Sequence, residues 1–346
     1  MLSAKRSLLK NVWRMFGRTP ATPLPETETP KPAPRTDVGG LVEEMLDQGR
    51  YTLLLRKQIA GSLRATQLDR ARQELGTSMA IVPAGDVFLE QPHLDDVDLP
   101  VGSGAKLVHI DEVFLDRYPV TNQAFRQFVD AGGYGQEALW DPEVWPGVAN
   151  FVDTTGQPAP RYWSASRFPE GQANHPVVGV NWFEATAFAR WSGKRLPTDP
   201  EWVKAASWPV AVNGANPAQR RYPWGDEMLA DRANVWDANR GKTTPVDHYE
   251  AGRSPGGIYD LCGNAWEWTS TGFGAWDGCQ YELDVPMRGL RGGAFDTYFD
   301  HQASCQFQSG EVQVARRHNI GFRCALGVCE IVPETIATNA IRQEVA

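Results

Sequence analysis

The distribution of tryptophan constrains the fold of this chain more than any other feature of its sequence. The chain has 346 residues and 13 tryptophans, and all but one of the tryptophans lie between Trp140 and Trp276. Glycine (33 residues) and proline (25 residues) are also frequent. Large aromatic side chains combined with many turn-forming residues favour a loop-rich domain with a ring-filled core over a helical bundle or a regular parallel sheet.

The composition excludes several classes of protein. No apolar run reaches the roughly 18 residues that a membrane-spanning helix needs, and no signal peptide is recognised. The net charge of -8 argues against a nucleic-acid partner. Five cysteines are too few, and odd in number, for a disulfide-stabilised secreted domain. We therefore expect a cytoplasmic protein, with peripheral attachment to a membrane as a variant of that expectation.

Positive charge is concentrated at the N-terminus. Residues 1–36 contain seven Lys or Arg and two Glu, a local net charge of +5, so the rest of the chain carries -13. Residues 1–18 combine apolar and basic side chains at helical spacing, which predicts a basic amphipathic segment that could bind an anionic membrane or a partner; a partly disordered tail is the alternative. Its apolar residues are Leu8, Leu9, Val12, Trp13 and Phe16, and its basic ones are Lys5, Arg6, Lys10, Arg14 and Arg18.

The rest of the chain divides into four segments. Residues 19–38 hold six prolines and are typical of an extended linker. Apolar stripes in residues 39–78 predict two or three short helices, which are too small to bury a core alone and must pack on the main domain or on a partner. Residues 79–330 form the main domain, and residues 331–346 a C-terminal tail. A protein partner or a membrane surface is expected to contact residues 1–78.

Local signals in the main domain predict an α+β fold. Residues 79–82 and 113–118 have strand patterns, and after residue 207 turn-forming dipeptides dominate. Three helices are each expected to begin at a side chain that accepts a hydrogen bond from the first turn. These N-cap residues are Thr121, Asn181 and Thr198, the last two with Glu184 and Glu201 as capping-box partners.

Eight segments of the main domain carry distinctive motifs. They are 79–85 (MAIVPAG), 118–122 (YPVTN), 175–180 (HPVVGV), 193–202 (GKRLPTDPEW), 222–226 (YPWGD), 263–269 (GNAWEWT), 291–295 (RGGAF) and 319–324 (NIGFRC). In sequence and in order, these segments resemble the formylglycine-generating enzyme family, also called the sulfatase-modifying factor family. The resemblance covers about 250 residues and implies the elaborated C-type-lectin-like fold of that family, with little regular secondary structure.

The resemblance implies that the copper site of the family is missing from this chain. Oxidase members hold Cu(I) between two cysteines that follow the Arg-Gly-Gly motif, because monovalent copper prefers soft thiolates. The matching positions here are Thr297 and Gln302, and a nearby serine of those oxidases is Ala294. Cys305 lies three residues beyond and supplies at most one thiol. We therefore expect neither copper binding nor formylglycine generation.

A second branch of the family, similar to ergothioneine-pathway sulfoxide synthases, binds non-haem iron partly through histidines of an N-terminal helical bundle. This chain has no histidine before His93, so that site is not expected. Asp300, His301 and His318 offer an alternative two-His-one-carboxylate set near the family cleft, whereas a polar ligand pocket or an exposed loop is the metal-free interpretation. Catalytic candidates are Trp266, Tyr298, Asp300, His301, Cys305 and His318, and ligand-pocket candidates are Asp296, Thr297, Gln302, Gln306, Arg316 and Asn319.

The resemblance also implies calcium as a structural cofactor. Asp260, Gly263, Ala265 and Glu267 match a family calcium site built from two side-chain oxygens and two backbone carbonyls, ligands that Ca²⁺ prefers. A second family site would begin at Asn234 and Val235. The alternative is that Asp260 and Glu267 only accept hydrogen bonds within the loops.

Three functional interpretations remain open from the sequence. The first is an accessory, maturation or binding factor that holds a peptide, a protein or a small molecule in the family cleft. The second is a metal-dependent oxidoreductase or protein-modifying enzyme of the non-haem iron type that uses other residues of that cleft. The third is a retroelement-diversified binding protein that varies the segment after the Arg-Gly-Gly motif.

Overall fold

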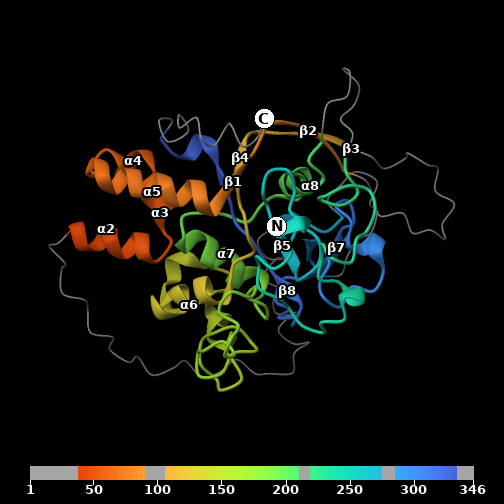
Figure 1. Cartoon of the computed structure of the whole chain (residues 1–346). Coiled ribbons are helices and arrows are strands. Elements are labelled where there is room, and N and C mark those ends of the chain that lie inside the picture. The colour runs from red at the N-terminus through yellow and green to blue at the C-terminus, as the bar shows by residue number, and fades with distance from the viewer. Residues whose placement is uncertain (1–37, 90–105, 210–218, 275–284, 333–346) are drawn as a thin grey trace.

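A computed structural model of the chain describes residues 38–89, 106–209, 219–274 and 285–332. The basic segment 1–18, the linker 19–38 except its last residue, and the tail 331–346 beyond residue 332 lie outside these ranges. Figure 1 shows short helices on one side of the molecule and loops with short strands on the other. No helix in the described ranges is long and apolar enough to cross a membrane.

The first region is helical, and it has four short helices instead of the two or three expected. They are α2 (Val38–Asp47), α3 (Tyr51–Leu54), α4 (Lys57–Ala60) and α5 (Ala65–Ser78). Buried side chains such as Leu54 and Leu75 share one core with Phe114 and Leu326 of the main domain. The main domain therefore covers much of the apolar face of these helices, although Leu41 remains 46% exposed.

Polar contacts also join this helical region to the main domain. The hydroxyl of Thr52, which is fully buried, donates to the backbone oxygen of Ser192. Arg56 donates to the backbone oxygen of Gly193 at 2.6 Å and forms an ion pair with Glu330 at 2.5 Å. These contacts tie α3 and the following turn to the end of α7.

We expect Thr52→Val to lower the free energy of unfolding by about 1–3 kcal/mol, because valine keeps the shape but leaves the buried oxygen of Ser192 without a donor. Chemical denaturation measures this change. Thr77→Val is the matched control, since Thr77 is exposed and donates only within its own helix. Equal effects of the two substitutions would contradict a specific role for the Thr52 contact.

A three-stranded antiparallel sheet lies next to these helices. Its order is β1 (Met79–Val82), β4 (Val113–Asp116) and β9 (Ala325–Gly327), with Ala80 opposite Leu115 and Phe114 opposite Leu326. Both strands predicted from the sequence are therefore confirmed. A separate hairpin pairs β2 (Gly85–Leu89) with β3 (Lys106–Ile110) and packs on α8.

The three helices of the main domain begin where the sequence predicts. They are α6 (Asn122–Asp130), α7 (Trp182–Trp191) and α8 (Asp199–Ser207). The side chains of Thr121, Asn181 and Thr198 accept hydrogen bonds from the backbone N–H three residues later. Each cap satisfies an amide that the helix cannot pair internally, which fixes the start of the helix.

A four-stranded sheet carries the second half of the domain. Its order is β7 (Ser309–Val312), β6 (Met287–Arg291), β5 (Trp266–Gly272) and β8 (Ile320–Gly321), with β5 and β8 parallel. Loops and single 3-10 turns connect these strands. The 3-10 turns of the domain are η1 (Gly133–Gly135), η2 (Glu137–Leu139), η3 (Trp145–Asn150), η4 (Trp236–Ala238), η5 (Glu250–Gly252), η6 (Asp300–Ala303) and η7 (Val328–Glu330).

Aromatic rings fill the core between these elements, as the tryptophan content predicts. Phe125 packs on Phe188 with ring centroids 5.4 Å apart, and it meets Trp163 and Phe322 edge to face. Trp202 and Trp268 are fully buried in the loop-rich half. Among the tryptophans with described positions, Trp236 departs most from this pattern, because it is 55% exposed.

Candidate functional site: an aromatic surface beside the family loop

The two positions that would carry copper ligands lie on the loop after β6. Thr297 is buried, and its hydroxyl accepts a hydrogen bond from the backbone N–H of Ala294 at 2.8 Å. Its backbone oxygen accepts from the N–H of Trp236 at 3.1 Å. Gln302 lies half-buried in η6. Thr297 therefore closes the loop on itself instead of presenting a side chain to a ligand.

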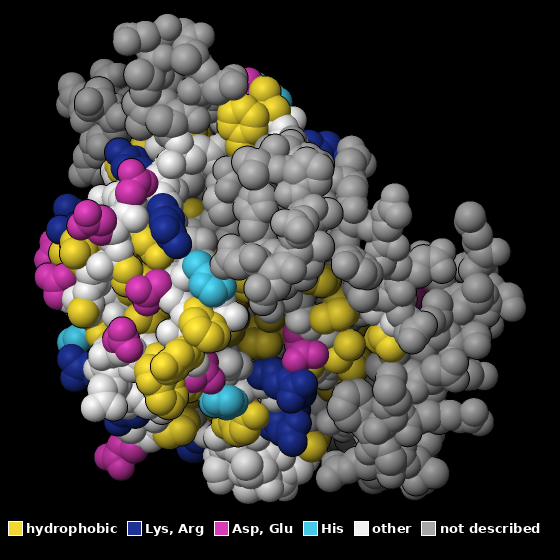
Figure 2. All heavy atoms as spheres, turned by 90° about the vertical axis from the view of Figure 1, so that its right-hand side faces the viewer, with side chains coloured by type: hydrophobic (Ala, Val, Ile, Leu, Met, Phe, Trp, Pro, Cys, Tyr) yellow, Lys and Arg dark blue, Asp and Glu magenta, His cyan; other side chains and the backbone are white. Residues whose placement is uncertain are grey.

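The loop instead presents aromatic rings to solvent. Tyr298 is 64% exposed and Phe299 53% exposed, and their ring centroids lie 5.0 Å apart. Tyr298 contacts Trp236 edge to face at 6.0 Å, and Phe299 stacks on His301 at 5.6 Å. We call these four residues the aromatic surface. Figure 2 views this side of the molecule, where hydrophobic and histidine side chains gather beside charged ones.

Polar side chains of the loop after β6 and of the segment before β8 contact each other next to the aromatic surface. The Nε2 atom of His318 lies 3.3 Å from a carboxylate oxygen of Asp296. The side-chain amide of Asn319 donates to both oxygens of the same carboxylate, at 3.0 and 3.1 Å. Trp266, which is half-buried, donates its backbone N–H to Asn319 and packs on Phe307. Asp296, His318 and Asn319 thus form one polar group at the surface.

The structure does not assemble the two-His-one-carboxylate set. His318 faces Asp296, whereas His301 stacks on Phe299 and meets Phe307 edge to face. Among the residues with described positions, no three His, Cys, Asp or Glu side chains are grouped to hold a metal ion. The described structure therefore does not bring Asp300, His301 and His318 together as one set of metal ligands, because the two histidines contact different neighbours.

Cys305 and Arg316 are structural rather than pocket residues. Cys305 is fully buried in a hydrophobic cluster, and burial raises the pKa of its thiol well above the ordinary value, which disfavours the nucleophilic thiolate. Arg316 donates to the backbone oxygens of residues 152, 159 and 179 and to the carboxylate of Glu184. Neither side chain has the freedom that a ligand contact requires.

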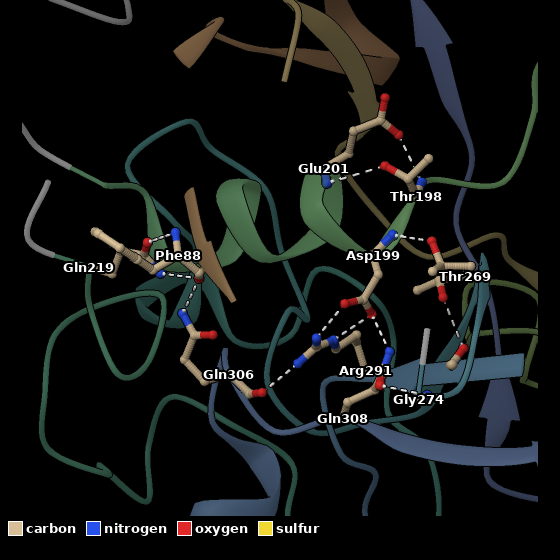
Figure 3. Close-up of polar contacts among 12 residues, drawn as sticks. Phe88, Thr198, Asp199, Glu201, Gln219, Thr269, Gly274, Arg291, Gln306 and Gln308 are labelled. Carbon is tan, nitrogen blue, oxygen red and sulfur yellow. Dashed lines mark hydrogen bonds and ion pairs between the residues drawn. The ribbon is translucent and has the colours of Figure 1, made fainter. Parts of the chain in front are cut away.

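Gln306 belongs to a buried polar network that the sequence analysis missed (Figure 3). Its backbone oxygen accepts from Arg291 at 2.5 Å, and its side-chain amide donates to the backbone of Phe88. Arg291 makes a two-pronged ion pair with Asp199, which also accepts from Gln308 at 2.9 Å. The arginine of the Arg-Gly-Gly motif thus fastens the segment that follows the aromatic surface to the start of α8.

The residues implied as calcium ligands differ in whether their oxygens are already used in hydrogen bonds. Both oxygens of Glu267 accept hydrogen bonds from the guanidinium of Arg323, at 2.7 Å each, and one also accepts from the indole of Trp202 at 2.7 Å. Glu267 is fully buried in this arrangement. Its carboxylate is the counter-ion of Arg323, so Glu267 does not fit a calcium site.

Asp260 and Asn234 fit a hard cation better. Asp260 is buried in a left-handed conformation (φ +53°), and burial raises the pKa of its carboxyl to about 8. The side-chain oxygen of Asn234 is buried without a hydrogen-bond donor. The Asn264 side chain joins the two, donating to Asp260 at 2.6 Å and accepting from Asn234 at 3.1 Å. An unpaired carbonyl oxygen and a buried carboxylate are donors that Ca²⁺ uses.

The backbone oxygens expected as calcium ligands are partly used already. Gly263 accepts from the N–H of Ala265 at 2.9 Å, and Val235 accepts from Ala238 at 3.0 Å. The two expected calcium sites are not separate in the fold, because a short parallel bridge pairs Asn234 with Gly263. Asn264, whose side chain bonds to both Asp260 and Asn234, was not identified from the sequence.

Comparison with known proteins identifies the family. Residues 64–328 match the family described as the sulfatase-modifying factor enzyme 1-like domain. The chain belongs to the sulfatase-modifying factor family. A formylglycine-generating enzyme of Streptomyces coelicolor is 32% identical over 290 residues, which cover 70% of this chain and 85% of that enzyme.

Other family members resemble the chain over part of their length. A hercynine oxygenase of Mycolicibacterium smegmatis is 39% identical over 218 residues, which are 59% of this chain and 47% of the oxygenase. The chain therefore spans less than half of the length of such relatives. PvdO from Pseudomonas aeruginosa matches with a TM-score of 0.50 at 21% identity, over 71% of this chain and 93% of PvdO. That likeness shows the fold, and it confirms the expected α+β formylglycine-generating-enzyme-like architecture.

Proposed function

We propose that this member of the sulfatase-modifying factor family is a non-oxidase binding factor, with an accessory or maturation role, that holds a peptide segment of a partner protein on the aromatic surface. The observation that carries the proposal is the exposure of Trp236, Tyr298 and Phe299 together, on the loop whose copper-ligand positions hold Thr297 and Gln302. Exposed contiguous aromatic rings are typical of binding sites, and tryptophan and tyrosine dominate binding energy at interfaces.

The neighbouring polar group supports a peptide as the ligand. Asp296, on the loop of the aromatic rings, and its neighbours His318 and Asn319, on the segment before β8, would supply polar groups beside the rings. A rim of polar side chains around an apolar centre is the usual composition of a protein-binding patch. The aromatic rings would supply contact area for the peptide, and the polar side chains of the rim would fix its orientation.

The test is selection of random displayed peptides on the immobilised full chain. We expect enriched peptides to bind the wild-type chain and to lose binding to the triple variant Trp236→Ala, Tyr298→Ala and Phe299→Ala, because these side chains supply the contact area. The matched control is Leu107→Ala with Leu229→Ala, which removes apolar side chains of 49% and 36% exposure elsewhere. Affinity is measured for each chain after its fold has been checked by circular dichroism.

Two outcomes would contradict the proposal. One is the absence of enriched peptides, or peptides that bind the triple variant as well as the wild type. The other is stoichiometric iron in the purified chain, which would favour the second candidate, a metal-dependent oxidoreductase. The 39% identity to a hercynine oxygenase over 218 residues is the observation that keeps this second candidate in view.

We further propose that calcium stabilises the loops through the carboxylate of Asp260 and the side-chain oxygen of Asn234. When bound, the ion would supply positive charge that keeps the Asp260 carboxyl ionised. The side-chain oxygen of Asn234, which has no hydrogen-bond donor, would coordinate the ion. Glu267 takes no part in this proposal, because its oxygens are bonded to Arg323 and Trp202.

A further inference from the structure

The aromatic surface is the most exposed apolar patch that the described part of the chain offers. Seven large hydrophobic side chains in those residues are exposed, and the three with the highest exposed fractions are Tyr298, Trp236 and Phe299. Ring contacts join them into one patch, whereas Leu41, Leu107 and Leu229 lie on other elements. A contiguous apolar patch on a soluble domain indicates something that covers it.

Acidic side chains flank this patch. Asp237 lies next to Trp236 in η4, and Asp300 follows Phe299 at the start of η6; both are exposed. The part of the chain after residue 36 carries a net charge of -13. The segment that would complement this patch is therefore apolar on one side and basic on the other.

The chain itself contains such a segment in residues 3–18. Leu8, Leu9, Val12, Trp13 and Phe16 recur at helical spacing, and five of the remaining eleven residues are Lys or Arg. Opposite net charges, +5 for residues 1–36 and -13 for the rest, favour contact between the two parts. The apolar side would lie on the rings, and the basic side would face Asp237 and Asp300.

The connection is long enough for this contact. The described structure begins at Val38, so 19 residues with six prolines separate it from Arg18. An extended proline-rich segment spans about 3.1 Å per residue, which gives roughly 59 Å for this connection. A globular domain of this size has a radius of gyration of roughly 18 Å, so the extended connection is roughly three times as long as that radius.

We propose that residues 3–18 dock on the aromatic surface of their own chain and compete there with the peptide ligand. This inference rests on the binding role proposed for that surface and adds its regulation. In the docked state the surface is covered, and a partner or a charged surface that captures the basic segment exposes it. Binding of the ligand and release of the N-terminal segment are then coupled, since both occupants need the same rings.

The experiment places a photo-crosslinker on the surface of the full chain. Tyr298 is replaced by p-benzoylphenylalanine, the protein is irradiated, and the cross-linked peptides are identified by mass spectrometry. We expect cross-links within one chain to residues 3–18, and a severalfold lower yield when Lys5→Glu, Arg6→Glu and Lys10→Glu are combined. The same crosslinker at Leu107, an exposed position on β3, is the control.

The charge-reversed chain supplies a second readout. Without the docked segment, the selected peptides are expected to bind severalfold more tightly than they bind the wild-type chain. An absence of cross-links to residues 3–18, an equal yield from Leu107, or cross-links only between two chains would overturn the docking. Binding of the basic segment to phosphatidylglycerol vesicles without any cross-link from Tyr298 would assign it to a membrane instead.

The docking and the proposed function fail in different ways. If selected peptides need the aromatic surface but Tyr298 never reaches residues 3–18, only the docking is overturned. If no peptide is selected by either the wild-type chain or the charge-reversed chain, the proposed function is overturned.

Discussion

Glu267→Gln is expected to lower the free energy of unfolding by about 3–5 kcal/mol, because it leaves the buried guanidinium of Arg323 without its counter-ion. Arg323 has no exposed area, and its other donors already reach the backbone oxygens of residues 116, 117 and 259. No water can replace the lost charge at this depth. For a domain of this size the melting temperature should fall by roughly 10 °C, which calorimetry measures directly.

The matched control is Glu311→Gln. Glu311 pairs with Arg317 at 2.7 Å, but the arginine side chain is 59% exposed, so this substitution should change the free energy of unfolding by at most about 1 kcal/mol. Equal losses in the two variants would show that Glu267 is not the counter-ion described here. A loss in Glu267→Gln that appears only when calcium is present would instead assign Glu267 to a cation site.

The elements of the fold were predictable where the signal is local. Thr121, Asn181 and Thr198 each accept a hydrogen bond from a residue three positions later, so the N-cap and its donor lie in one short stretch of sequence. The family motifs, which occur in the same order as in the family, predicted the overall fold. The fourth helix in residues 39–78 was missed because the extended backbone of Arg56 separates α3 from α4 within one apolar stripe.

The candidate site was predictable only in part, because its polar residues find partners that are distant in sequence. Arg316 contacts a carboxylate 132 residues away, Arg291 one that is 92 residues away, and Glu267 an arginine 56 residues away. From the family resemblance alone, polar residues in these segments are expected to contact a ligand. In the fold their hydrogen-bonding groups are used internally, and each satisfies a buried partner that would otherwise be unpaired.

Aromatic residues were expected in the core, but some of them lie at the surface. A tryptophan-rich sequence suggests rings in the core, and Trp163, Trp202 and Trp268 fulfil that expectation. Nothing local in the sequence distinguishes these from Trp236, whose exposure follows from its place in a 3-10 turn beside Tyr298. Three-dimensional structure was needed to separate the rings that stabilise the fold from those available for binding.

Asp260 is expected to make the stability of the chain depend on pH. Burial raises the pKa of its carboxyl to about 8, whereas an aspartate in the unfolded chain titrates near about 4. Between these values the folded chain binds one proton more than the unfolded chain, so the free energy of unfolding falls by about 1.4 kcal/mol per pH unit as pH rises. The stabilisation is complete below about pH 4 and is lost by about pH 8.

Asp260→Asn should therefore be more stable than the wild type at pH 8.5 in chelator, and nearly equal to it at pH 4. Calcium reverses this order if Asp260 and Asn234 hold the ion as proposed. At 100 times its dissociation constant, calcium adds about 2.7 kcal/mol to the wild type at pH 8.5 and much less at pH 5.5, where the proton competes for the carboxylate. The variant, which lacks the charged ligand, should gain little at either pH.

Melting temperatures of the wild type and Asp260→Asn, with calcium or chelator at both pH values, measure all of these effects. Asp111→Asn is the control, since Asp111 is exposed and lies between β3 and β4, outside the calcium ligands of the proposal. A wild type that melts at the same temperature in calcium and in chelator at pH 8.5 would exclude the ion. A pH dependence that remains unchanged in Asp260→Asn would assign it to another group, and both results together would leave Asp260 as a buried hydrogen-bond acceptor for Asn264.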